Sequence, residues 1–346
     1  MKRIEGIKMS TRIGKQTVVM SNPPIILGGA AIVGKKEGDG PLAKYFDEII
    51  DDEYYGEKSF ENAESRFLRD AFLKSLEKCA KAPTDIHFII SGDLQNQCTA
   101  ASYAFRDAGT PFIGVFGACS TMAESMSLGA MLIDGGAADI TACVTSSHFC
   151  SAEKQFRYPL EFGSQRTPTA QWTVTAAGSV LLGKQGIGPI ITHLTSGKII
   201  DLGIKDVNNM GGAMAPAAAD TIVMHLQDTG RSIDYYDTIL TGDLGSFGKS
   251  MLIRLLKDQD IDPGERYNDC GCMIFDIESQ QVDCGGSGCG CSAAVVSTYL
   301  LELMNHRKIN KVLFIATGAL LNPTRMQQGE SIPCIAHAVS IENRPA

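Results

Sequence analysis

One cysteine, Cys119, stands where its thiol could do chemistry. Residues 113–116 are typical of the end of a buried strand, and residues 120–134 of a helix that stops at two glycines. A thiol at such a strand-to-helix turn meets the positive end of the helix dipole, which lowers its pKa and makes it a nucleophile or an anion contact. Cysteine is also a common small buried residue, so simple packing is the alternative. The position at the turn favours the functional interpretation.

A polar triplet follows the next predicted strand. Ser146, Ser147 and His148 come directly after the apolar run 140–144. The carboxyl ends of parallel strands share one edge of a sheet, and open α/β sheets bind their ligands there, so we expect the triplet at the same edge as Cys119. The alternative is that each residue only completes a turn or caps a helix. We predict a ligand site that contains Cys119 and this triplet.

The other cysteines are numerous enough to raise the question of a metal site. Cys270 and Cys272 form one pair, Cys289 and Cys291 form another, and Cys284 lies between them. Structural zinc sites usually separate the members of a pair by two to four residues, so this spacing does not fit. An odd total of eleven cysteines, without a signal peptide, favours free thiols in a reducing compartment. We expect no metal site and no resident cofactor.

Two long stretches of the chain repeat. Residues 69–94 align without a gap on residues 219–244, and both copies end in Gly-Asp-Leu. Residues 118–146 align in the same way on residues 290–318, with an offset of 172 positions instead of 150. Each matched stretch contains a helical pattern that leads into a short apolar strand. The pattern predicts a duplicated chain whose second half carries about 22 extra residues between the two matches.

Alternating strands and helices predict the fold class. They indicate mixed, mainly parallel sheets that are buried on both faces. Two such halves would pack one helix layer of each against the other, which predicts a five-layer α/β fold of the order αβαβα. The glycine-rich run 183–188 separates two apolar strands. We therefore expect a basic arm over 1–13, an N-terminal half over 14–186 and a C-terminal half over 187–346.

The composition is that of a well-packed globular protein. Of 346 residues, 44% are hydrophobic and 20% are charged, which excludes the disordered and fibrous classes. The 31 basic and 39 acidic side chains give a formal charge of −8, which argues against a nucleic-acid partner. The sequence shows neither a signal peptide nor a membrane-spanning stretch, so we expect a soluble, cytoplasmic protein.

The first fifteen residues hold five lysines and arginines but only one acid, Glu5. Such an arm could rest on an anionic membrane surface, where each basic residue near the lipid adds about 1 kcal/mol. No apolar face accompanies these charges. A flexible, solvated tail is therefore the favoured interpretation, and any membrane attachment would run through a partner.

The duplication, with a cysteine at the head of a buried helix, resembles the thiolase superfamily, which includes the ketoacyl-synthase III enzymes. The motifs add a more specific resemblance, because the chain is similar to the stage V sporulation protein AD family of spore-forming Firmicutes. The stretches that carry it lie between Gly14 and His337 and read GKQTVVMSNPPI, EGDGPL, SGDLQNQ, FGACSTMAES, LIDGG, TSSH, EKQFRYP, MAPAAADTI, LTGDL, NDCG, GGSGC, ATGALL and ESIPCIAH.

This resemblance implies binding more than catalysis. The family belongs to a channel-associated complex that moves dipicolinic acid, with its calcium, into the developing spore. The resemblance implies dipicolinate in the pocket that the enzyme relatives use for acyl chemistry, and the other subunits of the complex as partners. It also implies a peripheral location at the cytoplasmic face of the forespore inner membrane. Relatives in the superfamily commonly dimerise, so we expect a homodimer.

The implied ligand is a small dianion. Backbone N–H groups at the start of the helix 120–134 suit a carboxylate. Asp93 and Asp243 end equivalent strands at the same edge, and their carboxylates would repel the ligand unless protonated or bridged by a cation such as calcium. For Asp243 we favour the alternative of a cap on the following turn or helix. Arg157 and Arg166 could pair with the ligand or serve in surface salt bridges.

Condensation chemistry needs a base beside the cysteine. In ketoacyl-synthase III relatives a histidine follows the strand that is formed here by residues 238–240, and this chain reads TGDL there. The thiolase C-terminal cysteine turn has only a partial counterpart in CIAH at 334–337, without the glycines that shape an oxyanion site. We therefore predict a non-catalytic protein. The alternatives are an acyltransferase or ketoacyl synthase with Cys119 as nucleophile and His148 or His337 as base, and a structural subunit with a vestigial pocket.

Overall fold

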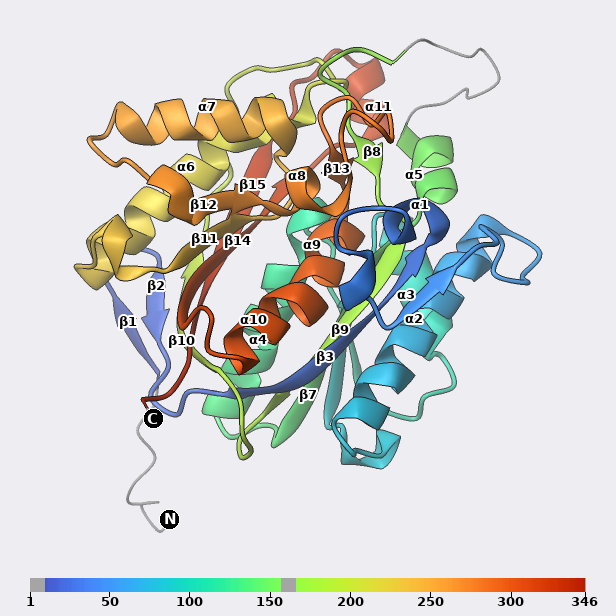
Figure 1. The fold of residues 1–346 in the computed structure, drawn as a ribbon, viewed down its shortest axis with the longest axis vertical. Helices are drawn as coiled ribbons and strands as arrows, with labels where there is room; N and C mark the ends of the chain where they lie inside the picture. Colours follow the sequence, from blue (N-terminus) through green and yellow to red (C-terminus); the bar gives the residue numbers. More distant parts are fainter. Residues whose placement is uncertain (1–9, 157–165, 346) are drawn as a thin grey trace.

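The computed structural model describes residues 10–156 and 166–345. Its main strands form one continuous hydrogen-bonded series, which consists of two sheets of the same construction joined at β3 and β10 (Figure 1). The first sheet has the strand order β3 (Ile25–Gly34), β9 (Ala176–Gly183), β7 (Ile140–Ser147), β5 (Phe88–Gly92) and β6 (Phe112–Gly114). The second has the order β10 (Ile190–Ser196), β15 (Cys334–Glu342), β14 (Lys311–Ala319), β11 (Thr238–Thr241) and β12 (Tyr267–Asp269).

The pairing pattern of the two sheets is identical. In each order the first two neighbouring pairs are antiparallel and the next two are parallel. The sheets touch edge to edge at one residue pair, Ile25 opposite Ile190. The shared order and pairing confirm the predicted duplication, because chance similarity would not reproduce the direction of every strand.

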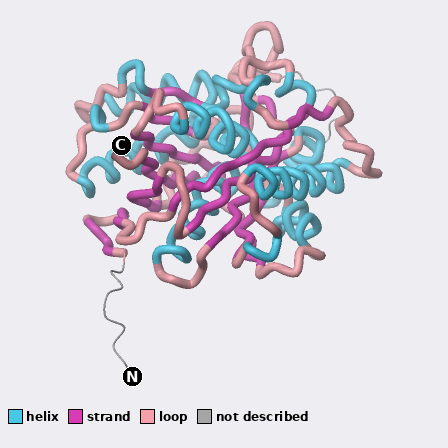
Figure 2. Tube along the Cα trace, turned by 60° about the horizontal axis from the view of Figure 1, so that its bottom comes forward, coloured by secondary structure: helices cyan, strands magenta, loops and turns pink. Residues whose placement is uncertain are grey.

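Helices cover both outer faces of this pair of sheets. Figure 2 shows the strands running between the helices. The outer helices are α2 (Phe60–Lys78) and α3 (Thr99–Phe105) on the first half, and α6 (Met210–Thr229) and α7 (Gly245–Lys257) on the second. A central layer completes the predicted five-layer αβαβα fold. It consists of α4 (Thr121–Asp134) and the continuous run of α9 (Cys289–Val295), a π-helical turn (Val296–Leu300) and α10 (Leu301–Asn305).

Small residues allow the central helices to pack against both sheets. A side chain at Gly178 on β9 would place its Cβ 2.4 Å from the backbone of Ala293 on α9. A side chain at Gly129 on α4 would meet Cys143 on β7 at 2.9 Å. A helix that is apolar or small on all sides is the expected signature of such burial. All seven residues of α9 are buried.

The remaining elements are short. They are β1 (Thr11–Ile13), β2 (Thr17–Val19), β4 (Glu48–Ile50), β8 (Trp172–Thr173), β13 (Gly286–Ser287), α1 (Lys35–Gly38), α5 (Phe149–Phe156), α8 (Cys270–Ile274) and α11 (Pro323–Gln327). The extra segment of the second half lies between β12 and α9, where it forms α8 and pairs β13 with β8. Among the described residues, none of the helices is both long enough and apolar enough to cross a membrane.

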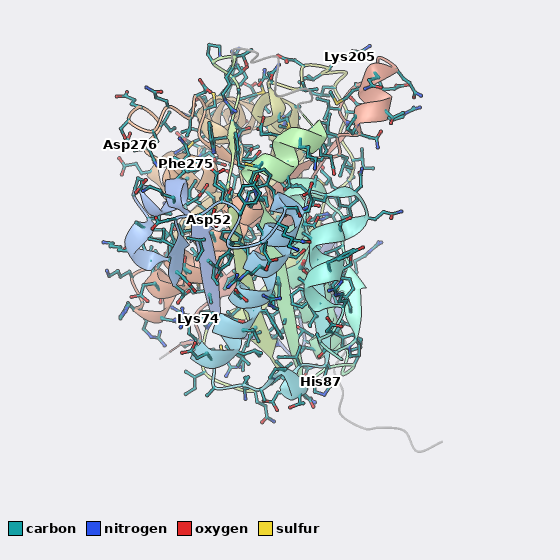
Figure 3. All side chains as sticks on the ribbon, turned by 90° about the vertical axis from the view of Figure 1, so that its right-hand side faces the viewer. Asp52, Lys74, His87, Lys205, Phe275 and Asp276 are labelled. Atoms are coloured by element: carbon teal, nitrogen blue, oxygen red, sulfur yellow. The ribbon has the colours of Figure 1, made fainter. Side chains whose placement is uncertain are left out.

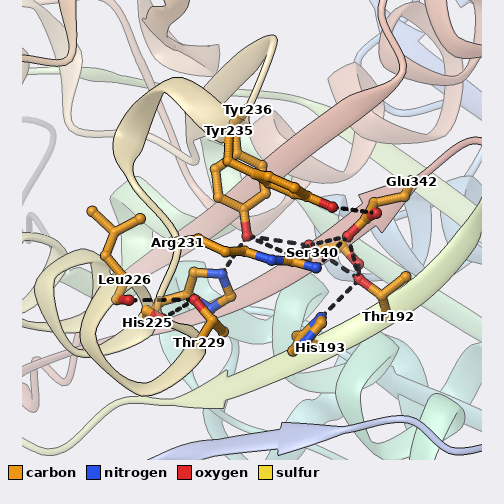
Figure 4. Close-up of polar contacts among 10 residues, drawn as sticks. All are labelled: Thr192, His193, His225, Leu226, Thr229, Arg231, Tyr235, Tyr236, Ser340 and Glu342. Atoms are coloured by element: carbon orange, nitrogen blue, oxygen red, sulfur yellow. Dashed lines mark hydrogen bonds and ion pairs between the residues drawn. The ribbon is translucent and has the colours of Figure 1, made fainter.

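A polar network ties the outer helix of the second half to its sheet (Figure 4). Arg231 forms an ion pair with Glu342 at 3.0 Å and donates a hydrogen bond to the Tyr236 hydroxyl at 2.9 Å. Tyr235 donates to the other carboxylate oxygen of Glu342, also at 2.9 Å. His225 of α6 is fully buried and shares a hydrogen bond with Tyr236. These contacts fix α6 against β15.

Candidate functional site

The turn that carries Cys119 is tightly held. A 3-10 turn, Ala118–Ser120, joins the end of the first sheet to α4. Ala118 has a φ of 52°, a left-handed conformation that costs a non-glycine residue about 1 to 2 kcal/mol. The Ser120 hydroxyl donates to the Gly117 carbonyl at 2.6 Å, and the Thr121 hydroxyl donates to the Ala118 carbonyl at 2.5 Å. The predicted helix over 120–134 is confirmed to within one residue.

Cys119 faces a cavity of about 220 Å³ between the two halves. Side chains from distant parts of the sequence line it, and most are apolar. The apolar ones are Leu94, Phe116, Ala118, Ala152, Phe156, Met210, Ala319, Leu320 and Leu321. The polar part of the wall is made by Cys119, Glu153, Thr173, Ser287, Gly288 and Asn322. The thiol itself is almost completely covered, with 8% of the residue exposed.

Asp243 lies beside the thiol. Its carboxylate is buried and within hydrogen-bonding reach of Cys119. One carboxylate oxygen accepts the backbone N–H of Gly288 at 2.8 Å, and the other accepts the hydroxyl of Thr317 at 2.9 Å. Burial raises the pKa of Asp243 to about 7, although the hydrogen bonds to the carboxylate lower the pKa and so oppose this effect. The carboxyl group is therefore partly protonated at neutral pH.

The expectation that Asp243 caps the next helix is wrong. The carboxylate of Asp269 does this instead, because it accepts the backbone N–H groups of Leu244 and Gly245 at 2.8 and 2.9 Å. Asp269 also caps α8 through the N–H of Cys272. A neighbouring strand thus supplies the cap, which leaves Asp243 to turn toward Cys119.

The predicted lowering of the Cys119 pKa is also wrong. Burial raises the pKa of this thiol well above its ordinary value, and the negative charge of Asp243 raises it further. The buried thiol of Cys289 contributes in the same direction. Desolvation outweighs the helix dipole here, because full burial can shift a pKa by about 3 to 5 units, whereas a helix terminus contributes about 0.3 to 1 kcal/mol, less than one unit.

No histidine lines the cavity, although all six histidines are among the described residues. His148 instead pairs its Nε2 with the Glu53 carbonyl at 2.9 Å and accepts the N–H of Cys150 at Nδ1. His337 lies on β15, where its Nδ1 accepts the N–H of Gly197 at 3.3 Å. Both candidate bases of the catalytic alternative are therefore engaged away from Cys119.

The serines of the triplet end β7 behind the first turn of α9. Ser146 donates to the carboxylate of Glu64 at 2.9 Å, and Ser147 donates to the Val174 carbonyl at 2.7 Å. The N–H of Gly290 donates to the Ser147 hydroxyl at 3.1 Å. Neither serine is part of the cavity wall. They support the start of α9, where the N-cap residue Gly288 forms part of the cavity wall.

Asp93 also lies behind the wall. Its two carboxylate oxygens accept the N–H groups of Gln95 and Ala101, both at 2.8 Å. Burial raises the pKa of Asp93 to about 8, and the charge of Glu64 adds to this. Among the predicted ligand residues Asp93, Cys119, Ser146, Ser147 and His148, the structure thus places only Cys119 in the cavity wall.

Sequence reasoning missed Glu64, which organises this region. It is 1% exposed and accepts hydrogen bonds from Gln95, Ser146 and Ser151. The signal for it existed, because Glu64 falls on the helical stripe of α2 that is otherwise apolar, together with Phe67, Leu68 and Ala71. A charged residue on such a stripe indicates a buried polar network.

Arg166 serves in ion pairs. Its guanidinium contacts Asp283 at 3.0 Å and Glu153 at 3.9 Å, and it lies over the ring of Trp172 at 5.0 Å. This agrees with the salt-bridge alternative for Arg166. Arg157 lies outside the described residues.

All eleven cysteines are free thiols. Cys119 and seven others are buried, and Cys79, Cys150 and Cys272 are partly exposed. Among the residues that the structure describes, no group of three or more His, Cys, Asp or Glu side chains is arranged to hold a metal ion. Cys289 donates its thiol to the Ser146 carbonyl at 2.9 Å, and Cys284 donates to the Pro168 carbonyl at 3.1 Å. These thiols take part in packing and local hydrogen bonds.

Known proteins match this chain along most of its length. The family model of stage V sporulation protein AD matches residues 14–342. Stage V sporulation protein AD of Bacillus subtilis (strain 168) is 44% identical over 329 residues, which cover 95% of this chain and 97% of that protein.

Solved structures support the fold. 3-Oxoacyl-[acyl-carrier-protein] synthase III from Aquifex aeolicus VF5 superposes with a TM-score of 0.56 at 12% identity, over 92% of this chain and 99% of that one. A variant of Xanthomonas campestris OleA with cerulenin gives a TM-score of 0.60 at 14% identity, over 95% and 97%. At these identities the likeness shows a shared thiolase-like fold only. With the sequence matches, it places the chain in the stage V sporulation protein AD family.

Proposed function

We propose that this protein is a non-catalytic member of the thiolase-like fold that binds dipicolinic acid in the cavity beside Cys119. In this proposal it supports uptake of the ligand into the developing spore, as the soluble subunit of a membrane channel complex at the cytoplasmic face of the forespore inner membrane. One observation carries the proposal. The cavity at the cysteine turn is present, but no histidine lines it, and burial raises the pKa of the Cys119 thiol well above its ordinary value.

The size and wall of the cavity support a small aromatic ligand. A cavity of about 150 Å³ holds one benzene ring. The 220 Å³ beside Cys119 therefore suits one ring with small substituents, such as a pyridine with two carboxylates. Phe116 and Phe156 supply aromatic surface for such a ring, and Thr173, Ser287 and Asn322 supply polar groups for its substituents.

Charge compensation for a dianion has two sources in this proposal. The cavity lies at the start of α4, whose dipole favours negative charge. Asp243 lies behind the cavity wall beside Cys119, and burial raises its pKa to about 7, so in its protonated form it adds no negative charge next to the ligand. Calcium that enters with the ligand would relieve the remaining repulsion by Asp243 and Glu153.

The rival proposal is an acyltransferase or ketoacyl synthase that uses Cys119 as nucleophile. Its support is the position of the thiol at the head of a buried helix, facing a cavity. The raised pKa of Cys119 and the engagement of His148 and His337 elsewhere weigh against it, because the thiolate is the nucleophilic form. A stable acyl group on Cys119 after incubation with an acyl-CoA would favour the rival.

Calorimetric titration of the full chain with dipicolinic acid, with and without calcium, tests the binding proposal. Ala152→Phe fills the cavity, and Ala137→Phe is the matched control because Ala137 is exposed. We expect saturable one-site binding in wild type and in the control, and its loss in Ala152→Phe. Phe156→Ala, which enlarges the cavity without overpacking, should weaken the affinity several-fold. The absence of heat at millimolar ligand in the wild type would contradict the proposal.

A further inference from the structure

The turn between β9 and β10 lies at the edge of the sheets opposite the cavity. β9 runs antiparallel to β7 and ends beside the start of β7, whereas the cavity lies at the other end of the parallel strands. Ile187 at the tip of this turn is 96% exposed. Gly186 and Gly188 flank it with φ angles of 148° and 151°, in a region that favours glycine. Figure 1 shows this edge at the lower end of the molecule.

Three adjoining cavities of about 570, 310 and 280 Å³ open around this turn. The first and third share Asn305, and the second continues into the third from Gln185 to Gly186. Three lysines line the first, two lysines the second and two arginines the third. Only two acids accompany these seven cations, Glu302 and Asp139. The formal charge of the whole chain is −8, so this basic surface runs against its overall charge.

Much of this positive charge is uncompensated within the protein. Lys78 pairs with Asp47 at 2.7 Å, and Lys184 pairs with Asp139 at 3.5 Å. By contrast, Lys81 and Lys308 form no salt bridge with any described residue. Exposed cations that an internal carboxylate does not hold are available to an anionic partner.

We propose that this basic surface, which includes Ile187, docks on an anionic phospholipid bilayer. The lysines and arginines would lie at the lipid phosphates, and the isoleucine would enter the apolar boundary beneath them. Lipid is the occupant that satisfies both features, because a bilayer offers phosphates to the cations and, directly beneath them, an apolar phase to a side chain that projects from a turn. The proposal rests on the peripheral membrane location in the proposed function. It adds that this chain contacts the lipid through its own surface, and not only through its partner subunits.

Sedimentation of the full chain with vesicles tests this surface. The vesicles contain phosphatidylcholine alone or phosphatidylcholine with phosphatidylglycerol. Each basic residue near an anionic surface contributes a factor of about five in affinity, so the double variant Lys81→Gln with Lys308→Gln should bind about 25-fold more weakly. Ile187→Ser should weaken binding about tenfold, because a buried isoleucine contributes at least that much. Both changes are on exposed or partly exposed side chains and leave the fold intact.

Lys205→Gln is the matched control. Figure 3 places Lys205 at the opposite end of the molecule from His87, which precedes the start of β5 at the basic edge. The proposal expects binding only to vesicles with phosphatidylglycerol, a loss of binding at high salt and no change in Lys205→Gln. Equal binding to both vesicles, no binding at all, or equal loss in Lys205→Gln would overturn it. Loss of binding only when Lys2, Arg3 and Lys8 are neutralised would overturn it as well.

The vesicle test and the ligand test are separable. The variants at Lys81, Lys308 and Ile187 lie at the opposite edge from the cavity, so calorimetry with dipicolinic acid should give the wild-type affinity for each. Vesicle binding without ligand binding would contradict the proposed function alone. Ligand binding without vesicle binding would contradict this inference alone.

Discussion

Cys119 and Asp243 form a pair whose protonation favours binding over catalysis. The pKa of the thiol is raised by burial, and that of the carboxyl group is raised to about 7 by the same cause. A thiol with a high pKa supplies little thiolate at neutral pH, which disfavours nucleophilic catalysis. Gly288 and Thr317 hold both carboxylate oxygens of Asp243 in place. In its protonated form Asp243 leaves the wall behind Cys119 uncharged.

Ligand affinity should therefore depend on pH through Asp243. Because the pKa of Asp243 is about 7, raising the pH above this value adds a negative charge beside a dianionic ligand. Affinity should fall as pH rises through 7, by up to about tenfold per pH unit. Asp243→Asn should bind dipicolinate with little dependence on pH between 6 and 8. Calorimetry across this window checks the prediction, and an unchanged pH dependence in Asp243→Asn would contradict it.

At the scale of the elements, the periodicity of apolar residues made the helices and strands predictable, but not which residues line the cavity. Helical and strand patterns place α4, β7 and the repeated units, because apolar spacing reflects burial directly. The cavity wall instead combines residues such as Phe156, Met210 and Leu321, which follow no common pattern. Only the packing of the two halves brings them together. For the same reason the sequence predicted Cys119 in the site but could not separate it from the triplet behind the wall.

The start of α9 depends on a glycine. Gly288 has a φ of 101°, and a Cβ there would lie 2.6 Å from the Ser147 hydroxyl oxygen. Gly288→Ala should lower the free energy of unfolding by about 2 to 5 kcal/mol, from backbone strain together with overpacking. Gly109→Ala is the control, because Gly109 also has a positive φ, of 66°, but nothing within 4 Å of an added Cβ. It should cost about 1 to 2 kcal/mol. Urea unfolding measures both, and equal losses would contradict the packing argument.

At the scale of the whole molecule, the two halves have diverged in their polar interiors. The first half buries Glu64 and Asp93 near the cavity. The second half holds a network of the half-buried Arg231 with the buried Tyr236 and His225 (Figure 4), and none of these three lines the cavity. The duplication was predictable because ungapped matches preserve the order of elements. The partners within each network were not, because they depend on strand order and on contacts between distant residues.

The buried histidine of this network should make stability depend on pH. Burial lowers the pKa of His225 to about 3, with the charges of His193 and Arg231 acting in the same direction and Asp228 opposing them. Between about 3 and the ordinary value of 6.5, the unfolded chain binds a proton at this residue that the folded protein excludes. This contribution to stability is therefore lost as pH falls through that window.

His225→Gln should remove this contribution to the pH dependence. The wild type should lose on the order of 2 kcal/mol more than the variant between pH 6.5 and pH 4. The variant should be less stable than wild type at pH 8, because one of the histidine's hydrogen bonds is lost. Chemical unfolding at several pH values gives the two curves. Parallel curves would show that His225 does not titrate on unfolding in this range.

A crystal structure of the full chain with dipicolinic acid tests the central claim most directly. The account predicts the ligand's ring in the cavity between Phe116 and Phe156, in contact with Cys119, with one carboxylate near Asp243. Density for the ligand at another place, or an empty cavity in crystals grown at a ligand concentration that saturates binding in solution, would contradict it.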